Sequence, residues 1–237
     1  MPTRLIPYVK VLIHLLCLTP VVWMYAQYRS GSLALQSDPI NLITHWTGDW
    51  ALWLLLVSLA VTPLRRFHSS LSNLVRFRRL IGLYAFFYAS LHLSTYVFLY
   101  SGYDIQTALT GLKQGHLAVL SEQWKVVWPD ILVDLQKRRF IQVGLVAFLL
   151  LLALALTSPK WVLRKMGGKN WQRLHRLVYI AAGAACLHYW WLVKAGVRKP
   201  LPDTLILAIL LLARMVWVIR KRQKAAVKTI EQGLTTA

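Results

Sequence analysis

The sequence predicts an all-α membrane protein: one bundle of about six transmembrane helices with both termini in the cytoplasm. Hydrophobic residues make up 57% of the 237 residues and charged residues only 15%, whereas soluble domains carry about 25% charged residues. The apolar residues are gathered in long runs that short basic connections separate. Apolar runs of about 18 residues or more are typical of membrane-spanning helices.

Six runs have close to the ~20 residues that cross about 30 Å of hydrocarbon at 1.5 Å per residue. They cover approximately residues 10–28, 43–63, 80–100, 140–157, 174–193 and 204–219. Pro20 lies inside the first run, where we expect a kink that neighbouring helices tolerate. No internal repeat is visible, so residues 1–237 are treated as a single transmembrane domain.

The basic residues predict the orientation of the bundle. Seventeen Lys and Arg residues fall on the side of the termini and nine on the other side. Because cytoplasmic loops carry the excess of Lys and Arg, both termini are placed inside and the chain is expected to be a multi-pass protein of an inner (cytoplasmic) membrane. The net charge of +20 is spread over these connections, which fits contact with anionic lipid headgroups and disfavours nucleic acid as a partner.

The longest connection, residues 101–137, mixes apolar and charged residues at helical spacing. It is placed on the outer side. Two interpretations stay open, namely one or two helices lying on the membrane surface and a docking surface for a soluble partner. Cys17 and Cys186 lie inside apolar runs and form no C-x-x-C motif, which disfavours a disulfide framework, an iron–sulfur cluster or covalently attached c-type haem.

Histidines are the main candidates for chemistry, because the predicted spans contain almost no carboxylates. His92 and His188 lie at one depth on the third and fifth spans, roughly 20 Å above the inner start of each helix. Two such histidines can bind one b-type haem iron from opposite faces. Small residues share the helix face of each histidine; they either make room for the flat haem or let two helices pack closely. They are Ala85, Ala89, Ala181, Ala184 and Ala185.

The remaining histidines leave alternatives open. His175 precedes His188 by 13 residues and either binds a second haem or meets lipid headgroups; Arg78 stands at the matching level of the third span. An ideal helix would place His175 and His188 about 140° apart, so two stacked haems need a distorted helix. His14 and His45 are either packing residues or a pair that binds a quinone head. His68 and His116 fall in loops.

Five segments in order resemble the ferric-reductase-like transmembrane proteins, and among them the MsrQ (YedZ) family. They are Ile43–Gly48, Arg78–Leu83, Leu91–Tyr96, Trp171–Tyr179 and Leu187–Trp190. The resemblance covers nearly the whole chain except residues 101–137. It implies haem b, one or two per chain, with His92 and His188 as axial ligands and His175 serving a cytoplasmic-side haem or flavin. FMN is also a possible cofactor, and Arg78, His14 and His45 are the other candidate cofactor-binding residues.

The resemblance also implies a role in electron transfer. Electrons would come from the quinone pool or a cytosolic flavin reductase. They would leave for a periplasmic molybdopterin-containing methionine sulfoxide reductase that repairs oxidised periplasmic proteins. On this hypothesis the chain is an electron-transfer subunit of an oxidoreductase system and not its catalytic subunit. Two alternatives stay open: a stand-alone transmembrane ferric or quinone reductase, and a transporter without haem.

Overall fold

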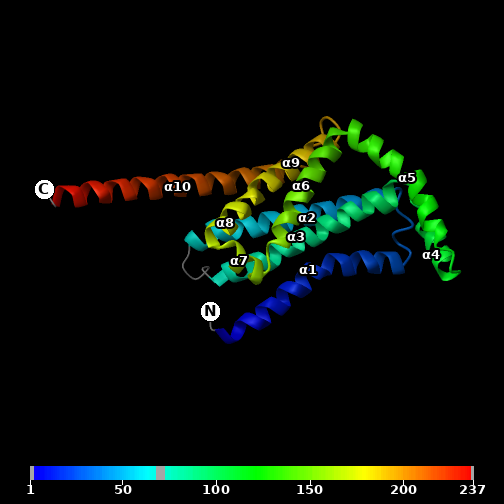
Figure 1. The fold of residues 1–237 in the computed structure, drawn as a ribbon, viewed down its shortest axis with the longest axis horizontal. Coiled ribbons are helices and arrows are strands. Elements are labelled where there is room, and N and C mark those ends of the chain that lie inside the picture. Colours follow the sequence, from blue (N-terminus) through cyan, green and yellow to red (C-terminus); the bar gives the residue numbers. More distant parts are fainter. Residues whose placement is uncertain (1–2, 68–72, 236–237) are drawn as a thin grey trace.

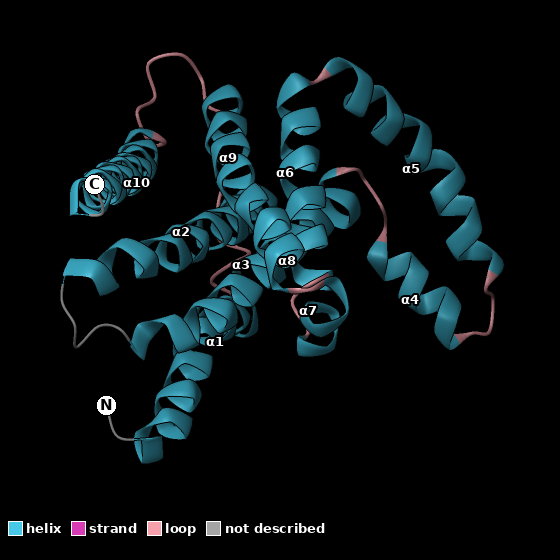
Figure 2. Ribbon diagram, turned by 60° about the vertical axis from the view of Figure 1, so that its left-hand side comes forward, coloured by secondary structure: helices cyan, strands magenta, loops and turns pink. Residues whose placement is uncertain are grey.

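The computed structural model describes residues 3–67 and 73–235, so His68 lies outside the described residues. Every regular element within them is helical, which confirms the predicted all-α membrane protein (Figures 1 and 2). The helices are α1 (Ile6–Arg29), α2 (Pro39–Phe67), α3 (Val75–Thr95), α4 (Ile105–Lys113), α5 (Ala118–Lys137), α6 (Arg139–Leu156), α7 (Lys160–Met166), α8 (Gly168–Leu174), α9 (Val178–Leu192) and α10 (Leu201–Thr235).

Five helices of the described part are long and apolar enough to cross a membrane. They cover Ile6–Arg29, Pro39–Arg66, Val75–Tyr100, Arg139–Leu156 and Leu201–Ala225, and they match five of the six predicted spans. The third includes a π-helical turn, Tyr96–Tyr100, after α3.

The predicted span 174–193 takes a different form. Its α-helical part, α9, has only 15 residues, because a 3₁₀ turn at His175–Leu177 separates it from α8. This helix therefore falls short of the usual length of a membrane span by itself.

Two pairs of adjacent helices form the centre of the bundle. α2 packs along α3, and α6 packs along α9; the two pairs meet through α3 with α6 and α2 with α9. The core between them contains leucines together with Ala85, Tyr88, Ala181 and Ala182, all four without exposed surface. The two pairs are the scaffold that places the candidate site.

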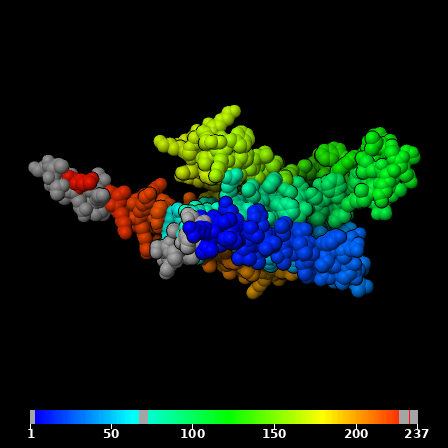
Figure 3. Space-filling model, turned by 90° about the horizontal axis from the view of Figure 1, so that it is seen from below, coloured from blue at the N-terminus to red at the C-terminus, as the bar shows by residue number. Residues whose placement is uncertain are grey.

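The remaining helices surround this centre. α1 runs along one face of the bundle (Figures 1 and 3) and bends (Figure 1). Pro20, inside α1, is the cause expected for such a bend. The carbonyl oxygen of Cys17, one turn earlier, accepts a hydrogen bond from the Tyr88 hydroxyl at 2.7 Å. α10 continues beyond the bundle at the end where α1 begins (Figure 1).

The connection 101–137 folds into two helices, α4 and α5, which project at the opposite end of the bundle (Figures 1 and 3). Asp104 caps α4 by accepting a hydrogen bond from the backbone N–H of Thr107 at 3.0 Å. The Tyr96 hydroxyl donates to Asp134 of α5 at 3.0 Å, which ties this arm to the end of the third span. Contact of α4 and α5 with the membrane surface or with a partner stays a prediction.

Candidate functional site

His92, on α3, is held by the neighbouring helix α2. Its Nδ1 lies 2.9 Å from the carbonyl oxygen of Thr44. Because a carbonyl only accepts, Nδ1 carries the hydrogen and donates it. Gly48 stands one turn after Thr44, and a Cβ atom there would lie 3.1 Å from both Nδ1 and Cε1 of His92. The missing side chain lets the imidazole lie close against the backbone of α2.

His188, on α9, is held by α6 in the same way. Its Nδ1 donates to the carbonyl oxygen of Phe140 at 2.7 Å. Gly144 stands one turn after Phe140, and a Cβ atom there would lie only 2.6 Å from Nδ1 of His188. This approach is too close for any side chain, so the position of the ring requires glycine at residue 144.

The two arrangements have the same sequence spacing. Each histidine follows the residue that supplies its carbonyl partner by 48 positions. The glycine stands four positions after that residue in both cases. Every member of the second set therefore follows its counterpart by 96 positions, and the two helix pairs contribute one histidine each. The structure thus reveals an internal correspondence that the sequence pattern did not.

The two histidines face a common space between the helix pairs. Their ring centroids lie 6.0 Å apart with an angle of 78° between the ring planes. Since each Nδ1 carries the hydrogen, each Nε2 keeps its lone pair for a metal. Two imidazoles that bind one ion from opposite sides, each with its nitrogen about 2.0–2.1 Å from the ion, have centroids about 6 Å apart. The centroid separation of this pair therefore fits two imidazoles that would hold one metal ion between them.

The alanines that share a helix face with His92 or His188 differ in how far they are buried. Ala85 and Ala181 have no exposed surface and lie in the packed core, which agrees with the alternative that they serve close helix packing. Ala89 and Ala185 are half-buried beside that core.

His175 lies in the 3₁₀ turn that precedes α9. Its ring stacks on Trp171 with centroids 3.8 Å apart, and its Nε2 lies 3.2 Å from the Thr157 hydroxyl. Arg78 and Arg79 are close enough for their charges to act on it, so the structure brings Arg78 and His175 to one level. No group of three or more His, Cys, Asp or Glu residues suited to a metal ion occurs in the described part of the chain.

His14 and His45 have different neighbours. His14 packs edge to face against Tyr84, and its Nδ1 lies 2.7 Å from the Tyr84 hydroxyl. His45 interacts electrostatically with Asp49 and with His92, so it borders the pair formed by His92 and His188. The hydrogen bond of His14 agrees with the interpretation of a packing residue, and a quinone site formed by His14 and His45 stays a prediction.

Sequence reasoning missed the supporting half of the site, which consists of Gly48, Gly144 and two backbone carbonyls. One signal was present: each glycine precedes a histidine by 44 positions. That signal becomes meaningful only after α2 is known to pack on α3 and α6 on α9.

The fold and the site define a class: a helical membrane protein in which two helix pairs present opposed histidines. The family model described as "Ferric reductase like transmembrane component" matches residues 47–186, and the chain belongs to this family. The match includes His92 and His175 and ends two residues before His188.

Curated relatives carry the name "Protein-methionine-sulfoxide reductase heme-binding subunit MsrQ". The protein from Herminiimonas arsenicoxydans is 42% identical over 193 residues, which are 80% of this chain and 77% of the relative. The protein from Xanthomonas axonopodis pv. citri is 41% identical over 92% of this chain and 90% of the relative. The Rhodospirillum rubrum protein is 39% identical over 90% of each chain. No solved structure matches the chain.

Proposed function

We propose that this chain is the haem-binding membrane subunit of a methionine sulfoxide reductase system and that it passes electrons across the bacterial inner membrane. The observation that carries the proposal is the pair His92 and His188. Their ring centroids lie 6.0 Å apart, and each Nδ1 is hydrogen-bonded to a backbone carbonyl oxygen. The printed name of the relatives, a haem-binding subunit, supports the same cofactor.

In this proposal His92 and His188 would hold a b-type haem, which would supply reversible one-electron transfer when bound. The carbonyls of Thr44 and Phe140 fix the ring tautomers and leave Nε2 free for iron. Gly48 and Gly144 allow the rings to approach the helices that orient them. The chain itself makes and breaks no substrate bond. Its task is to position the cofactor and tune its potential through ligands and burial.

The direction of transfer follows from the expected orientation. We infer that electrons enter from the quinone pool or a cytosolic flavin reductase. They leave at the outer side, where His92 and His188 lie in the outer half of their helices. The acceptor is a periplasmic molybdopterin-containing methionine sulfoxide reductase, in line with the name of the relatives.

His175 is proposed to hold a second cofactor on the cytoplasmic side. The 3₁₀ turn at His175–Leu177 supports this, because three steps of 120° in place of 100° reduce the angle between His175 and His188 from about 140° to about 80°. Arg78, which lies near His175, offers a cation for an anionic cofactor such as the phosphate of FMN.

An optical spectrum of the detergent-purified chain, oxidised and then reduced with dithionite, tests the haem. We expect a sharp reduced b-type α-band, and pyridine haemochrome quantitation gives the number of haems per polypeptide. Colourless protein from haem-replete cells would contradict the proposal and favour a transporter without haem. Reduction of ferric chelates by the isolated chain at the rate of the complete system would favour a stand-alone reductase.

Single substitutions test the ligands. His92→Ala and His188→Ala should each abolish the haem held by the pair, whereas His175→Ala should remove at most part of the absorbance. His14→Ala is the matched control, because this membrane histidine is bonded to Tyr84 and should leave the spectrum unchanged. Complete haem loss from His175→Ala, with haem retained in His92→Ala, would overturn the ligand assignment.

A further inference from the structure

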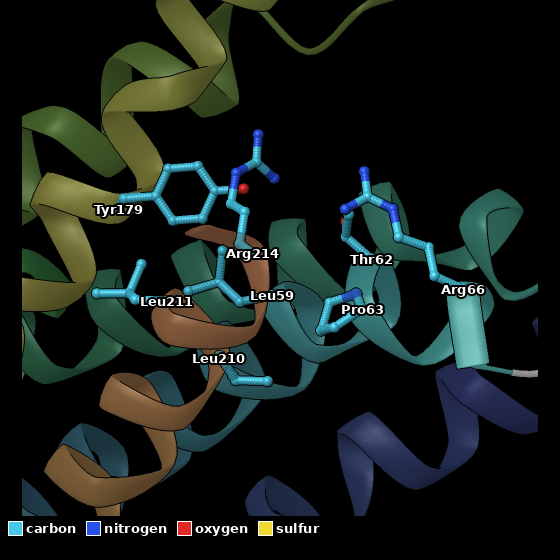
Figure 4. A pocket seen from close by; sticks show the side chains of 8 residues that line it. All are labelled: Leu59, Thr62, Pro63, Arg66, Tyr179, Leu210, Leu211 and Arg214. Atoms are coloured by element: carbon cyan, nitrogen blue, oxygen red, sulfur yellow. The ribbon is translucent and has the colours of Figure 1, made fainter. Parts of the chain in front are cut away.

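A cleft between α2, α9 and α10 lies at the end of the bundle where α2 ends and α9 begins. Its floor is apolar and its rim carries two arginines, Arg66 and Arg214, together with Tyr179 (Figure 4). Both guanidinium groups extend to the same side of the cleft (Figure 4). The apolar floor consists of Leu59, Pro63, Leu210 and Leu211.

Aromatic rings hold the cations of this rim in place. The guanidinium of Arg66 lies 3.4 Å from the ring centroid of Trp217, and the ammonium of Lys221 lies 5.4 Å from the same centroid. The guanidinium of Arg214 lies 4.6 Å from the centroid of Tyr179. These contacts orient three positive charges, but a neutral ring cancels none of them. The charges of Arg66 and Arg214 also act on each other.

No carboxylate balances these charges in the described part of the chain. The ion pairs found there join Lys125 to Glu122 and Arg138 to Asp134. Three of these residues belong to the arm at the opposite end, and Arg138 directly follows it. Asp49 and Asp203 lie in the halves of α2 and α10 nearest that opposite end. The cleft is therefore a site of uncompensated positive charge, which an external anion would stabilise.

The positions of the rim residues along their helices indicate which kind of anion the cleft would meet. Arg66 is the last residue of the span Pro39–Arg66, and Tyr179 is the second residue of α9. Arg214 lies about 20 Å along α10 from Leu201, within an otherwise apolar run, and an arginine at such a depth extends its charge toward the nearer interface. The rim thus lies at the level of lipid headgroups.

We propose that this cleft binds the phosphate of an anionic phospholipid, with Arg66 and Arg214 as the main ligands. Two arginines above an apolar floor suit a phosphate that carries apolar chains. The acyl chains would lie against the exposed apolar face of α10, where Leu212 and Met215 are each 54% exposed. This site is separate from the histidines and does not depend on the proposed function.

Native mass spectrometry of the full-length purified chain tests the proposal, with phosphatidylglycerol and phosphatidylcholine of identical acyl chains as probes. The double variant Arg66→Gln/Arg214→Gln should bind phosphatidylglycerol about thirtyfold more weakly. The control Arg220→Gln/Arg222→Gln removes two positive charges from α10 at residues that do not line the cleft, and it should change binding less than about twofold. Unchanged preference for phosphatidylglycerol in the first variant, or equal loss in the control, would overturn the site.

Two further arms separate other phosphate sources and folding defects. Inorganic phosphate and FMN should not displace phosphatidylglycerol at equal concentration; displacement by either would show that the cleft takes a soluble phosphate and would overturn the lipid assignment. Far-UV circular dichroism on heating checks that each variant folds. If the double variant does not fold, Arg214→Lys keeps the charge but loses the planar fork. Its phosphatidylglycerol affinity should fall several-fold, and an unchanged affinity would refute the proposal.

Discussion

Gly144→Ala is the sharpest test of the structure around His188. The added methyl would lie 2.6 Å from Nδ1 of His188, about 0.8 Å short of the 3.4 Å at which ordinary contact begins. The ring cannot move away and keep its 2.7 Å hydrogen bond to Phe140. Overpacking costs about 1–3 kcal/mol and the lost hydrogen bond about 1 kcal/mol, while alanine returns about 0.5–1 kcal/mol of helix propensity. We expect a net loss of about 1–3 kcal/mol on these terms.

The assay is haem per polypeptide, measured as pyridine haemochrome after purification. Loss of the group that orients a metal-binding histidine lowers metal affinity about 10–100-fold, so Gly144→Ala should emerge largely free of the haem held by His92 and His188. A Cβ atom at Gly48 would be only about 0.3 Å closer to His92 than ordinary contact allows. Gly48→Ala should therefore retain most of its haem. Gly183→Ala, with open space around it, is the control and should be neutral or slightly stabilising. Equal haem content in Gly144→Ala and Gly183→Ala would refute the reasoning.

Three further predictions concern contacts outside the pair. His14→Phe should cost about 1 kcal/mol of stability by removing the hydrogen bond to Tyr84, visible as a lower midpoint of thermal unfolding with an unchanged spectrum; a changed spectrum would argue against a packing role. Tyr96→Phe removes the 3.0 Å bond to Asp134 and should speed proteolytic cleavage within the arm 101–137; unchanged cleavage would show that the bond does not hold the arm. Hydrogen bonds from Thr107 lower the pKa of Asp104, so this carboxylate stabilises α4 above its unfolded pKa of about 3.9 and loses that effect as pH falls through its lower folded pKa. Asp104→Ala should therefore speed amide exchange in α4 at neutral pH, and wild-type rates would contradict the cap.

The sequence alone was enough for the apolar helices, because span length and hydrophobicity follow directly from bilayer thickness. It was not enough for α9. The run 174–193 is apolar apart from His175, Arg176 and His188, and hydrophobicity does not distinguish an α-helical turn from the 3₁₀ turn that the structure has at His175–Leu177. The sequence was also insufficient for the bend in α1: Pro20 predicts a kink but not the direction in which the helix bends.

The candidate site, too, could be predicted only in part from the sequence. The depth of His92 and His188 could be calculated from their positions, since rise per residue is fixed. The groups that support these histidines could not be predicted from the sequence, because two of them are backbone carbonyls and two are glycines, which have no side chain. The sequence also left the role of His14 open between packing and a quinone site shared with His45, because only packing shows that His14 meets Tyr84.

The correspondence between the two helix pairs explains why the two levels of the bundle differ. At the level of His92 and His188 it is complete: carbonyl, glycine and histidine recur after 96 residues, so both sides of the pair are built alike. At the level of His175 it breaks, because the residue 96 positions before His175 is Arg79. An arginine cannot take the place of an imidazole as a ligand, since its guanidinium stays protonated and has no lone pair to give. The cofactor that we propose for His175 would therefore have no second histidine opposite it at position 79. One histidine with a nearby pair of arginines favours an anionic cofactor over a second haem held by two histidines.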